Sequence, residues 1–414
     1  MHSGSSWAFS PADLDPYTGC GVIGVRQTRK WLGLTLPILI LVAALPAAAD
    51  VAAFPDPGLH AAVQDALGLA GQPIDTRDLE RLTTLLAGGR GISDLTGLEA
   101  CRDLQQLYLY DNQIVDLSPL AGLQSLVVLN LSGNRVVDIA TLAGLTNLAS
   151  LTLHGNQITD LGALAGLPNL NTLSVGNLVR DITPVASLPQ LERLKLYVRP
   201  EADLAPLAQL RHLIFLLLST GQPMSGRVVF DPAVLASAEG LASLQLHGYD
   251  IADVEVLEDA APNLTELSLQ YVGIDDLVAF ADFERLTTLT LSWLVTDPDD
   301  GELDLSRLAL PVSLRILVLE GNGIEDLSGL AGLEAITSLS LPRNEITDIA
   351  PLGALENLQG LDLSFNPLTD LSPLLGLSRL RSLNLQGVPF DPSEGSDANA
   401  VLRELLDRAV DIIY

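Results

Sequence analysis

A repeat of about 22 residues runs along most of this chain and restricts what it can fold into. Residues 107–126 read LYLYDNQIVDLSPLAGLQSL, and residues 129–148 read LNLSGNRVVDIATLAGLTNL. The first leucine of the repeat recurs from Leu82 to Leu380, which gives about fourteen copies. One copy has too few aliphatic side chains to offset the entropy that is lost when its backbone becomes ordered. The copies must therefore stack on one another and share a continuous core.

Each part of the repeat predicts a local structure. The Leu-x-Leu pair has the period of two of a short strand with one buried face. The asparagine that follows the strand can bond backbone groups in a turn, and the aspartate four residues later can cap a short helical turn. Leucines three residues apart then suit a 3₁₀ helix. The turn asparagines are Asn112, Asn134, Asn156, Asn322, Asn344 and Asn366, and the capping aspartates are Asp94, Asp116, Asp138, Asp160, Asp203, Asp253, Asp276, Asp326, Asp348 and Asp370.

With these motifs, the sequence resembles a bacterial leucine-rich repeat protein of the 22-residue class, similar to the internalins. The resemblance implies an α/β solenoid, a right-handed leucine-rich repeat horseshoe with a parallel β-sheet on its concave side. Short 3₁₀ or helical segments are implied on the convex side, with a helical cap at the N-terminus. It also implies that function consists of binding another macromolecule on the concave side.

The N-terminal region predicts export from the cytoplasm. Residues 26–49 read RQTRKWLGLTLPILILVAALPAAA, a basic flank followed by an apolar run that ends in small residues. This pattern is typical of a secretory signal peptide, and cleavage is expected before Asp50. An uncleaved membrane anchor is the alternative, because residues 31–49 are nearly long enough to span a bilayer. The expected location is therefore secreted, extracellular, periplasmic or at the cell surface, with no membrane span after cleavage.

The predicted organisation has four parts. They are the N-terminal extension with the signal peptide at 1–49, a helical cap at 50–81, the repeats at 82–388, and a C-terminal cap at 389–414. In the first cap, Asp56 is the predicted N-cap of a helix whose first residue is Pro57. In the second, a helix is expected over residues 399–408, followed by a short strand. Each cap would cover a leucine edge that otherwise faces water.

The net charge of -29 excludes two classes of partner, because nucleic acids and anionic membranes both require a basic surface. Two cysteines are too few for a disulfide framework, and Cys101 stands at a leucine position of the repeat, so we expect a buried core residue there. No cofactor is expected. The sequence GCGVIG at 19–24 has the spacing of a dinucleotide-binding loop. Such a loop follows a strand, and no strand is expected before residue 19, so we do not interpret it as a dinucleotide site.

Catalytic and metal sites have little support in the sequence. Neither G-x-S-x-G nor H-E-x-x-H is present. His154 and His247 lie four repeats apart, roughly 19 Å at the spacing of parallel strands, so they cannot share a substrate atom. We therefore do not expect an enzyme. The insertion DPDDGELD is a weak calcium candidate, because its acidic residues do not have the spacing of an EF-hand loop. The simpler interpretation is a solvated acidic loop. The acidic residues of the insertion are Asp297, Asp299, Asp300, Glu302 and Asp304.

The residues that vary between copies at the strand positions should point to the concave side. Most are Ser, Thr, Asn or Gln, while aromatic and basic residues concentrate in the N-terminal half. Aromatic residues and arginine anchor many protein interfaces, although strand positions favour Thr, Tyr and Phe in any case. The predicted partner-binding residues are Tyr108, Tyr110, Asn130, His154, Arg193, Lys195, Tyr197, Phe215, Gln245 and His247.

The copies between residues 170 and 313 depart from the repeat. They lack the turn asparagine, and two of them carry insertions of about six residues. Decay of the consensus is one explanation. The other is that the insertions project loops beside the concave face and shape a specific site.

Together these features predict a secreted, monomeric, non-enzymatic protein that binds a protein partner on its concave face, for adhesion or recognition. The strip of Ser, Thr and Asn and the exposed tyrosines leave a cell-wall or carbohydrate binding module as an alternative. A structural scaffold without a discrete site is the third alternative.

Overall fold

The computed structural model describes residues 51–69, 71–221, 228–252, 254–274, 280–294, 303–393 and 395–414, and the side chains of 177 and 178 are not described. These residues belong to one compact unit. The predicted signal segment and its cleavage site before Asp50 lie outside the described residues. Among the helices of the described part, none has the length and apolar character needed to cross a bilayer.

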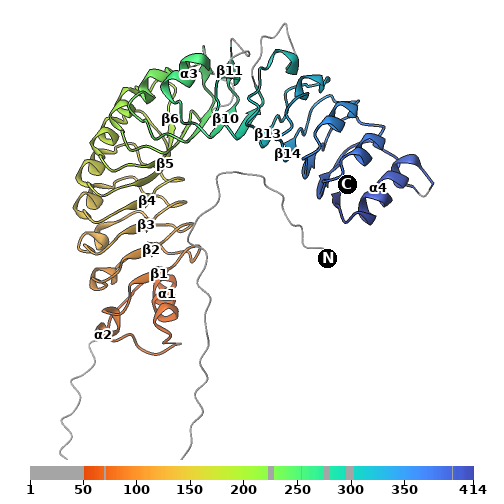
Figure 1. Ribbon diagram of the computed structural model, residues 1–414. Helices are drawn as coiled ribbons and strands as arrows, with labels where there is room; N and C mark the ends of the chain where they lie inside the picture. The colour runs from red at the N-terminus through yellow and green to blue at the C-terminus, as the bar shows by residue number, and fades with distance from the viewer. Residues whose placement is uncertain are drawn as a thin grey trace, which may run out of the picture. The chain divides into compact units, whose positions relative to one another are not determined.

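One parallel sheet of 15 strands lines the inner side of a curved solenoid, and short helices lie on its outer side (Figure 1). Each copy of the repeat supplies one strand, and the C-terminal cap adds the last, which confirms the predicted horseshoe. The strands are β1 (Thr84–Leu86), β2 (Gln106–Tyr108), β3 (Val128–Asn130), β4 (Ser150–Thr152), β5 (Thr172–Val179), β6 (Arg193–Val198), β7 (Phe215–Ser219), β8 (Ser243–His247), β10 (Glu266–Gln270), β12 (Thr288–Ser292), β13 (Ile316–Val318), β14 (Ser338–Ser340), β15 (Gly360–Asp362), β16 (Ser382–Asn384) and β17 (Asp411–Ile413).

The register of the sheet aligns equivalent residues of successive copies. Leu107 of β2 pairs with Leu129 of β3, which in turn pairs with Leu151 of β4. Because the leucines of every copy point to the same side, they form one continuous aliphatic core. Cys101 is fully buried in this core, as predicted, and burial raises the pKa of its thiol to about 12, with a further contribution from Glu99.

Short 3₁₀ helices form most of the outer side, and the predicted aspartates begin them. The Asp116 carboxylate accepts from the backbone N–H of Ser118 at 2.8 Å, and the same bond to the residue two places on recurs at each predicted aspartate in the described part. Asp253 and Asp276 lie outside that part. The 3₁₀ helices are Leu98–Ala100, Ser118–Leu120, Ala140–Gly144, Gly162–Gly166, Thr183–Ser187, Ala205–Gln209, Pro232–Leu235, Leu305–Arg307, Ser328–Leu330, Ala350–Ala354 and Ser372–Gly376.

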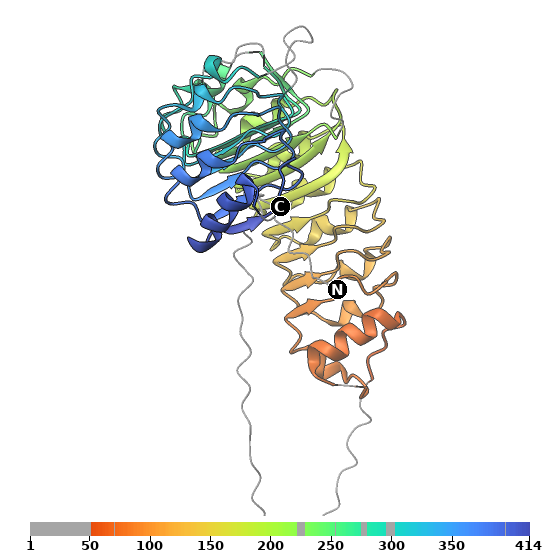
Figure 2. The same ribbon diagram turned by 90° about the vertical axis from the view of Figure 1, so that its right-hand side faces the viewer.

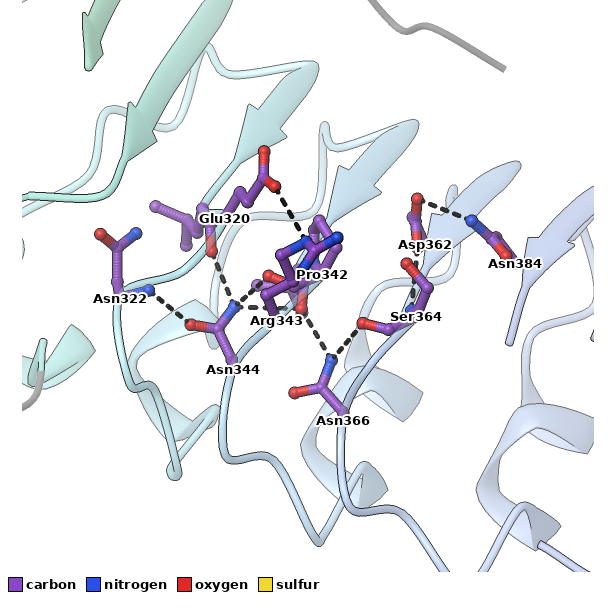
Figure 3. A network of polar contacts seen from close by, with 11 residues as sticks. Glu320, Asn322, Pro342, Arg343, Asn344, Asp362, Ser364, Asn366 and Asn384 are labelled. Carbon is purple, nitrogen blue, oxygen red and sulfur yellow. Dashed lines mark hydrogen bonds and ion pairs between the residues drawn. The ribbon is translucent and has the colours of Figure 1, made fainter. Parts of the chain in front are cut away.

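The turn asparagines form a buried ladder that ties each copy to the one before it. The Asn344 side-chain amide donates to the carbonyls of Leu341 in its own copy and Leu319 in the preceding copy. Its side-chain oxygen accepts from the backbone N–H of Asn322 (Figure 3) and from that of Ile324. Each asparagine therefore satisfies main-chain groups of two neighbouring turns, which would otherwise be buried without partners.

The residue just before the asparagine position of the repeat, whether or not an asparagine stands there, has a left-handed backbone with a positive φ in most copies. Glycine is favoured there because it has no Cβ, and Gly133, Gly155, Gly321 and Gly387 occupy this position. Five larger residues occupy it in other copies, namely Asp111, Tyr271, Trp293, Arg343 and Phe365, with φ between 53° and 58°. A left-handed conformation costs a residue with a Cβ roughly 1–2 kcal/mol, so these copies are locally strained.

The irregular copies close their turns in a different way. In two of the copies that lack the asparagine, β9 (Asp250–Ile251) and β11 (Gly273–Ile274) pair as a second small parallel sheet. Tyr249 takes the asparagine position and packs edge-on against Phe230, with ring centroids 5.9 Å apart. A substitute for the ladder therefore accompanies the loss of the consensus. The centres of the two insertions, residues 222–227 and 295–302, lie outside the described residues, so loops that shape a site stay a prediction.

Helices cover both ends of the solenoid. Helix α1 (Pro57–Leu67) begins after the N-cap Asp56, as predicted, and lies against β1 at the N-terminal end (Figure 2). Helix α4 (Asp397–Asp407) starts two residues earlier than predicted, because Ser396 rather than a later residue caps it. Within the described residues the other α-helices are α2 (Thr76–Leu79) and α3 (Val254–Ala260).

Candidate functional site

Two cations and a phenyl ring meet on the concave face of β6 and β7. Arg193 and Lys195 are alternate residues of β6, so both side chains point to the same side of the sheet. The Arg193 guanidinium lies 4.7 Å from the centre of the Phe215 ring, and the Lys195 ammonium lies 5.6 Å from it. Both contacts are within the range of cation–π attraction. The ring is only 4% exposed, so it holds the two charges in place rather than facing a ligand itself.

Tyr197 and His154 extend this group toward β4. Gly176 of β5 pairs with Tyr197, and a Cβ placed on Gly176 would lie 2.8 Å from the His154 Cβ and 3.4 Å from the Tyr197 ring. The absence of a side chain at Gly176 therefore lets the two larger side chains approach each other. We call His154, Arg193, Lys195, Tyr197 and Phe215 the basic cluster.

The electrostatics of the two concave histidines favour their neutral forms. Burial and the nearby Lys195 ammonium lower the pKa of His154, while Asp111 opposes this shift. Burial lowers the pKa of His247. The positive charge of the basic cluster at neutral pH is therefore that of Arg193 and Lys195.

The other predicted site residues lie outside the basic cluster. Tyr108 and Tyr110 belong to the copy of β2, four strands from β6, and Tyr110 is 43% exposed. The Asn130 side-chain oxygen accepts from the Ser132 backbone at 3.0 Å and from its hydroxyl at 2.7 Å, so this asparagine is engaged in a local turn. Gln245 is almost fully buried.

A strip of buried hydroxyl and amide groups follows the basic cluster on β7 to β12. Ser243 donates to the Glu266 carboxylate at 3.0 Å, and Gln245 donates to its other oxygen at 3.4 Å. His247, on the same strand as Gln245, is partly buried. The buried polar residues of this strip are Ser219, Ser243, Gln245, Ser268, Thr290 and Ser292.

A row of aromatic and arginine side chains that the strand pattern did not predict lies along one edge of the concave face. Tyr271, Trp293, Arg343 and Phe365 occupy the left-handed position of their copies, and we call them the aromatic rim. The Tyr271 and Trp293 rings stack, 9° from parallel with centroids 6.3 Å apart. The Arg343 guanidinium lies 4.6 Å from the centre of the Phe365 ring. The sequence contains a signal for this row, since a large residue replaces glycine one place beyond the last outward-facing strand position of these copies.

The calcium candidate is covered by the structure only in part. Asp297, Asp299, Asp300 and Glu302 lie outside the described residues. Asp304 accepts from the Ser306 backbone at 2.9 Å and from its hydroxyl at 2.6 Å, and so begins a 3₁₀ helix like the other repeat aspartates. Within the described part, no three His, Cys, Asp or Glu residues converge on a position that could hold a metal.

Comparison with models of protein families identifies leucine-rich repeats in two parts of the chain. The family model for leucine-rich repeats in two copies matches residues 102–144, 124–166, 146–187 and 356–394. These matches fall almost entirely on copies that follow the consensus. No curated protein matched the chain.

Solved structures extend the similarity over most of the chain. An internalin from Listeria monocytogenes is 28% identical over 83% of this chain and 98% of its own, with a TM-score of 0.62. A leucine-rich repeat protein from Leptospira interrogans is 21% identical over 82% of this chain and 97% of its own, with a TM-score of 0.58, and shares the fold. The functional domain of InlJ from Listeria monocytogenes also shares the fold. It is 22% identical over 82% of this chain and 75% of its own, with a TM-score of 0.57. The chain therefore contains leucine-rich repeats in the matched residues, and over most of its length it is similar in fold to bacterial proteins of the internalin type.

Proposed function

We propose that this protein binds a protein partner on its concave face and that the basic cluster is the centre of the contact. Leucine-rich repeat proteins of the internalin type mediate protein–protein interactions. The observation that carries the proposal is the pair of cations held on the Phe215 ring, in a chain with 22 basic and 51 acidic residues. Two of its few cations are thus ordered side by side on the inner face.

The chemistry of the cluster favours an acidic group on the partner. Arginine presents planar donors that suit a carboxylate, and tyrosine adds apolar area with a hydroxyl at its tip. Repulsion between Arg193 and Lys195 is relieved when an anion binds between them. We further propose that the protein is exported, acts as a monomer and carries out no chemical step of its own.

The test is capture of a partner from an envelope extract by immobilised protein, with identification by mass spectrometry. We expect the variant Arg193→Gln/Lys195→Gln to capture the same protein at least about tenfold less well, which corresponds to about 1.4 kcal/mol. The variant Tyr108→Ala/Tyr110→Ala would report whether the contact reaches as far as β2.

The matched control removes two cations elsewhere. Arg102 and Arg211 are exposed and lie outside the strands, so Arg102→Gln/Arg211→Gln changes the net charge equally and should leave capture intact. Equal loss in both double variants would assign the effect to overall charge. Undiminished capture by Arg193→Gln/Lys195→Gln would remove the basic cluster from the proposal.

A carbohydrate ligand is the second candidate, and the hydroxyl and amide strip on β7 to β12 favours it. Such groups donate to and accept from sugar hydroxyls. A glycan array separates the two candidates: saturable binding that Ser268→Ala/Thr290→Val abolishes, and that Arg193→Gln/Lys195→Gln leaves unchanged, would favour the carbohydrate. If neither assay yields a ligand, the results favour a structural scaffold without a discrete binding site.

A further inference from the structure

The aromatic rim is not required by the repeat itself. Neighbouring copies place Gly321 and Gly387 at the same left-handed position and keep the same sheet register. The rim residues therefore keep bulky side chains where glycine would relieve backbone strain. Strained positions that persist in this way occur mainly at functional sites.

The rim side chains are ordered by contacts between copies. A Cβ placed on Gly321 would lie 2.5 Å from the Trp293 ring, so that ring lies directly over the glycine. The Phe365 ring lies over Gly387 in the same way, with Arg343 on its other side and 43% of its surface still exposed. Tryptophan, tyrosine and arginine are the residue types that dominate binding energy in protein interfaces.

The concave face beside the rim is acidic. At the outward strand positions of the copies from β10 to β16, the charged residues are Glu266, Glu320 and Asp362, and none is basic. The Glu320 carboxylate is 3.6 Å from the Arg343 side chain and 36% exposed. Burial raises the pKa of Glu320; Arg343 opposes this and Asp362 adds to it, so this carboxylate gains from an additional cation.

We propose that the aromatic rim, together with Glu320 and Asp362, is a docking site for a cationic polypeptide segment. Lysine or arginine heads of the segment would pair with the two carboxylates, while their methylene stems cover the exposed edges of the rim rings. The charge of the whole chain, -29, attracts a cationic segment to the molecule, and the three carboxylates favour this part of the concave face. This site goes beyond the basic cluster, which lies on other strands and has the opposite charge.

The probe is a fluorescently labelled octa-arginine peptide, and binding to the full chain is followed by anisotropy in physiological salt. We expect saturable binding, with Glu320→Gln and Phe365→Gly each weakening it about tenfold. Phe365→Gly supplies the residue that the next copy has at this position, Gly387, so the thermal unfolding midpoint of the variant should remain close to that of the parent. Octa-glutamate should not bind.

The control for charge is Glu325→Gln, an exposed glutamate of the same copy as Glu320 that lies away from the strand. It removes the same charge and should leave the affinity unchanged, as should Arg193→Gln/Lys195→Gln, which separates this site from the basic cluster. If Glu320→Gln and Glu325→Gln weaken the binding of the peptide equally, the attraction depends only on the net charge of the chain, and the proposal is overturned. Unchanged affinity in Phe365→Gly, or the absence of saturable binding, would also overturn it.

Discussion

At the scale of single residues, Tyr249 shows what the irregular copies lose with the asparagine. It is 2% exposed, and among the described residues its hydroxyl is the buried side-chain polar atom without a hydrogen-bond partner. Burial raises the pKa of this hydroxyl. A buried donor without a partner is unfavourable by about 1–3 kcal/mol.

We therefore expect Tyr249→Phe to leave the free energy of unfolding unchanged or to raise it by about 1 kcal/mol. The packing of the ring against Phe230 is retained in this variant. Urea unfolding followed by circular dichroism measures the effect, and Tyr249→Ala serves as the control that removes the ring and should destabilise. A loss of stability in Tyr249→Phe would mean that the hydroxyl has a bonded partner in solution.

Asp56 links the N-terminal cap to the first repeat through one carboxylate. Its two oxygens accept from the backbone N–H groups of Gly58 and Leu59 at the start of α1, and of Ser93 and Asp94 in the repeat. Burial acts to raise the pKa of Asp56, but these four donors outweigh it and lower the pKa below the usual value of 3.8. The ionised form is thus the one that the fold stabilises.

This shift has a defined sign for stability. Because the folded-state pKa is lower than the unfolded one, the contribution of Asp56 is present above pH about 4 and is lost as the pH falls through the folded value. Asp56→Asn should lower the free energy of unfolding by about 2 kcal/mol at pH 7. The gap between parent and variant should narrow toward pH 3. A gap that is independent of pH, or one matched by the exposed control Asp103→Asn, would contradict this assignment.

At the scale of elements, the asparagine ladder holds successive turns together. The Asn134 amide donates to the carbonyls of Leu131 and Leu109, and its oxygen accepts from the Ile114 backbone. Asn134→Ala leaves these buried groups without partners, and we expect a loss of about 2–4 kcal/mol in the free energy of unfolding. Asn147 donates once, to the Gln124 carbonyl, at an exposed site, so Asn147→Ala should cost about 0.5 kcal/mol or less. Similar losses in both variants would argue against a structural ladder.

At the scale of the whole molecule, the net charge of -29 opposes the compact state through self-repulsion. Added salt screens this repulsion, so the thermal unfolding midpoint at pH 7 should rise between 10 mM and 150 mM sodium chloride. Near the sequence pI of 4.2 the repulsion disappears, and the salt increment should disappear with it. If salt raises the unfolding midpoint equally at both pH values, the effect is general salting-out and not the screening of charge repulsion.

The charge is also arranged along the concave face. The basic cluster lies on β6 and β7, whereas Glu266, Glu320 and Asp362 lie on later strands of the same sheet. The two proposed sites thus have opposite sign on one inner surface. A partner that carries an acidic and a basic group could engage both, and its orientation along the solenoid would follow from the charges.

The repeat was sufficient to predict the parts of the structure that are local and periodic. The strand leucines, the turn asparagine and the capping aspartate each act within a few residues or on the equivalent residue of the next copy. A fixed spacing therefore specifies their contacts, and Leu107, Asn112 and Asp116 all take the predicted roles. The same spacing placed Arg193, Lys195 and Phe215 on the inner face.

Only the tertiary structure decided how the exceptions are used. The small sheet of β9 and β11 replaces the ladder through pairing between copies of unequal length, which no fixed period specifies. The aromatic rim depends on a left-handed backbone and on a ring lying over the glycine of the next copy. The periodic sequence determined the fold because equivalent residues of successive copies make the same contact. The two proposed sites lie where a copy has a different residue at an equivalent position. At those positions the packing of the particular side chains defines the surface, and a fixed spacing does not specify it.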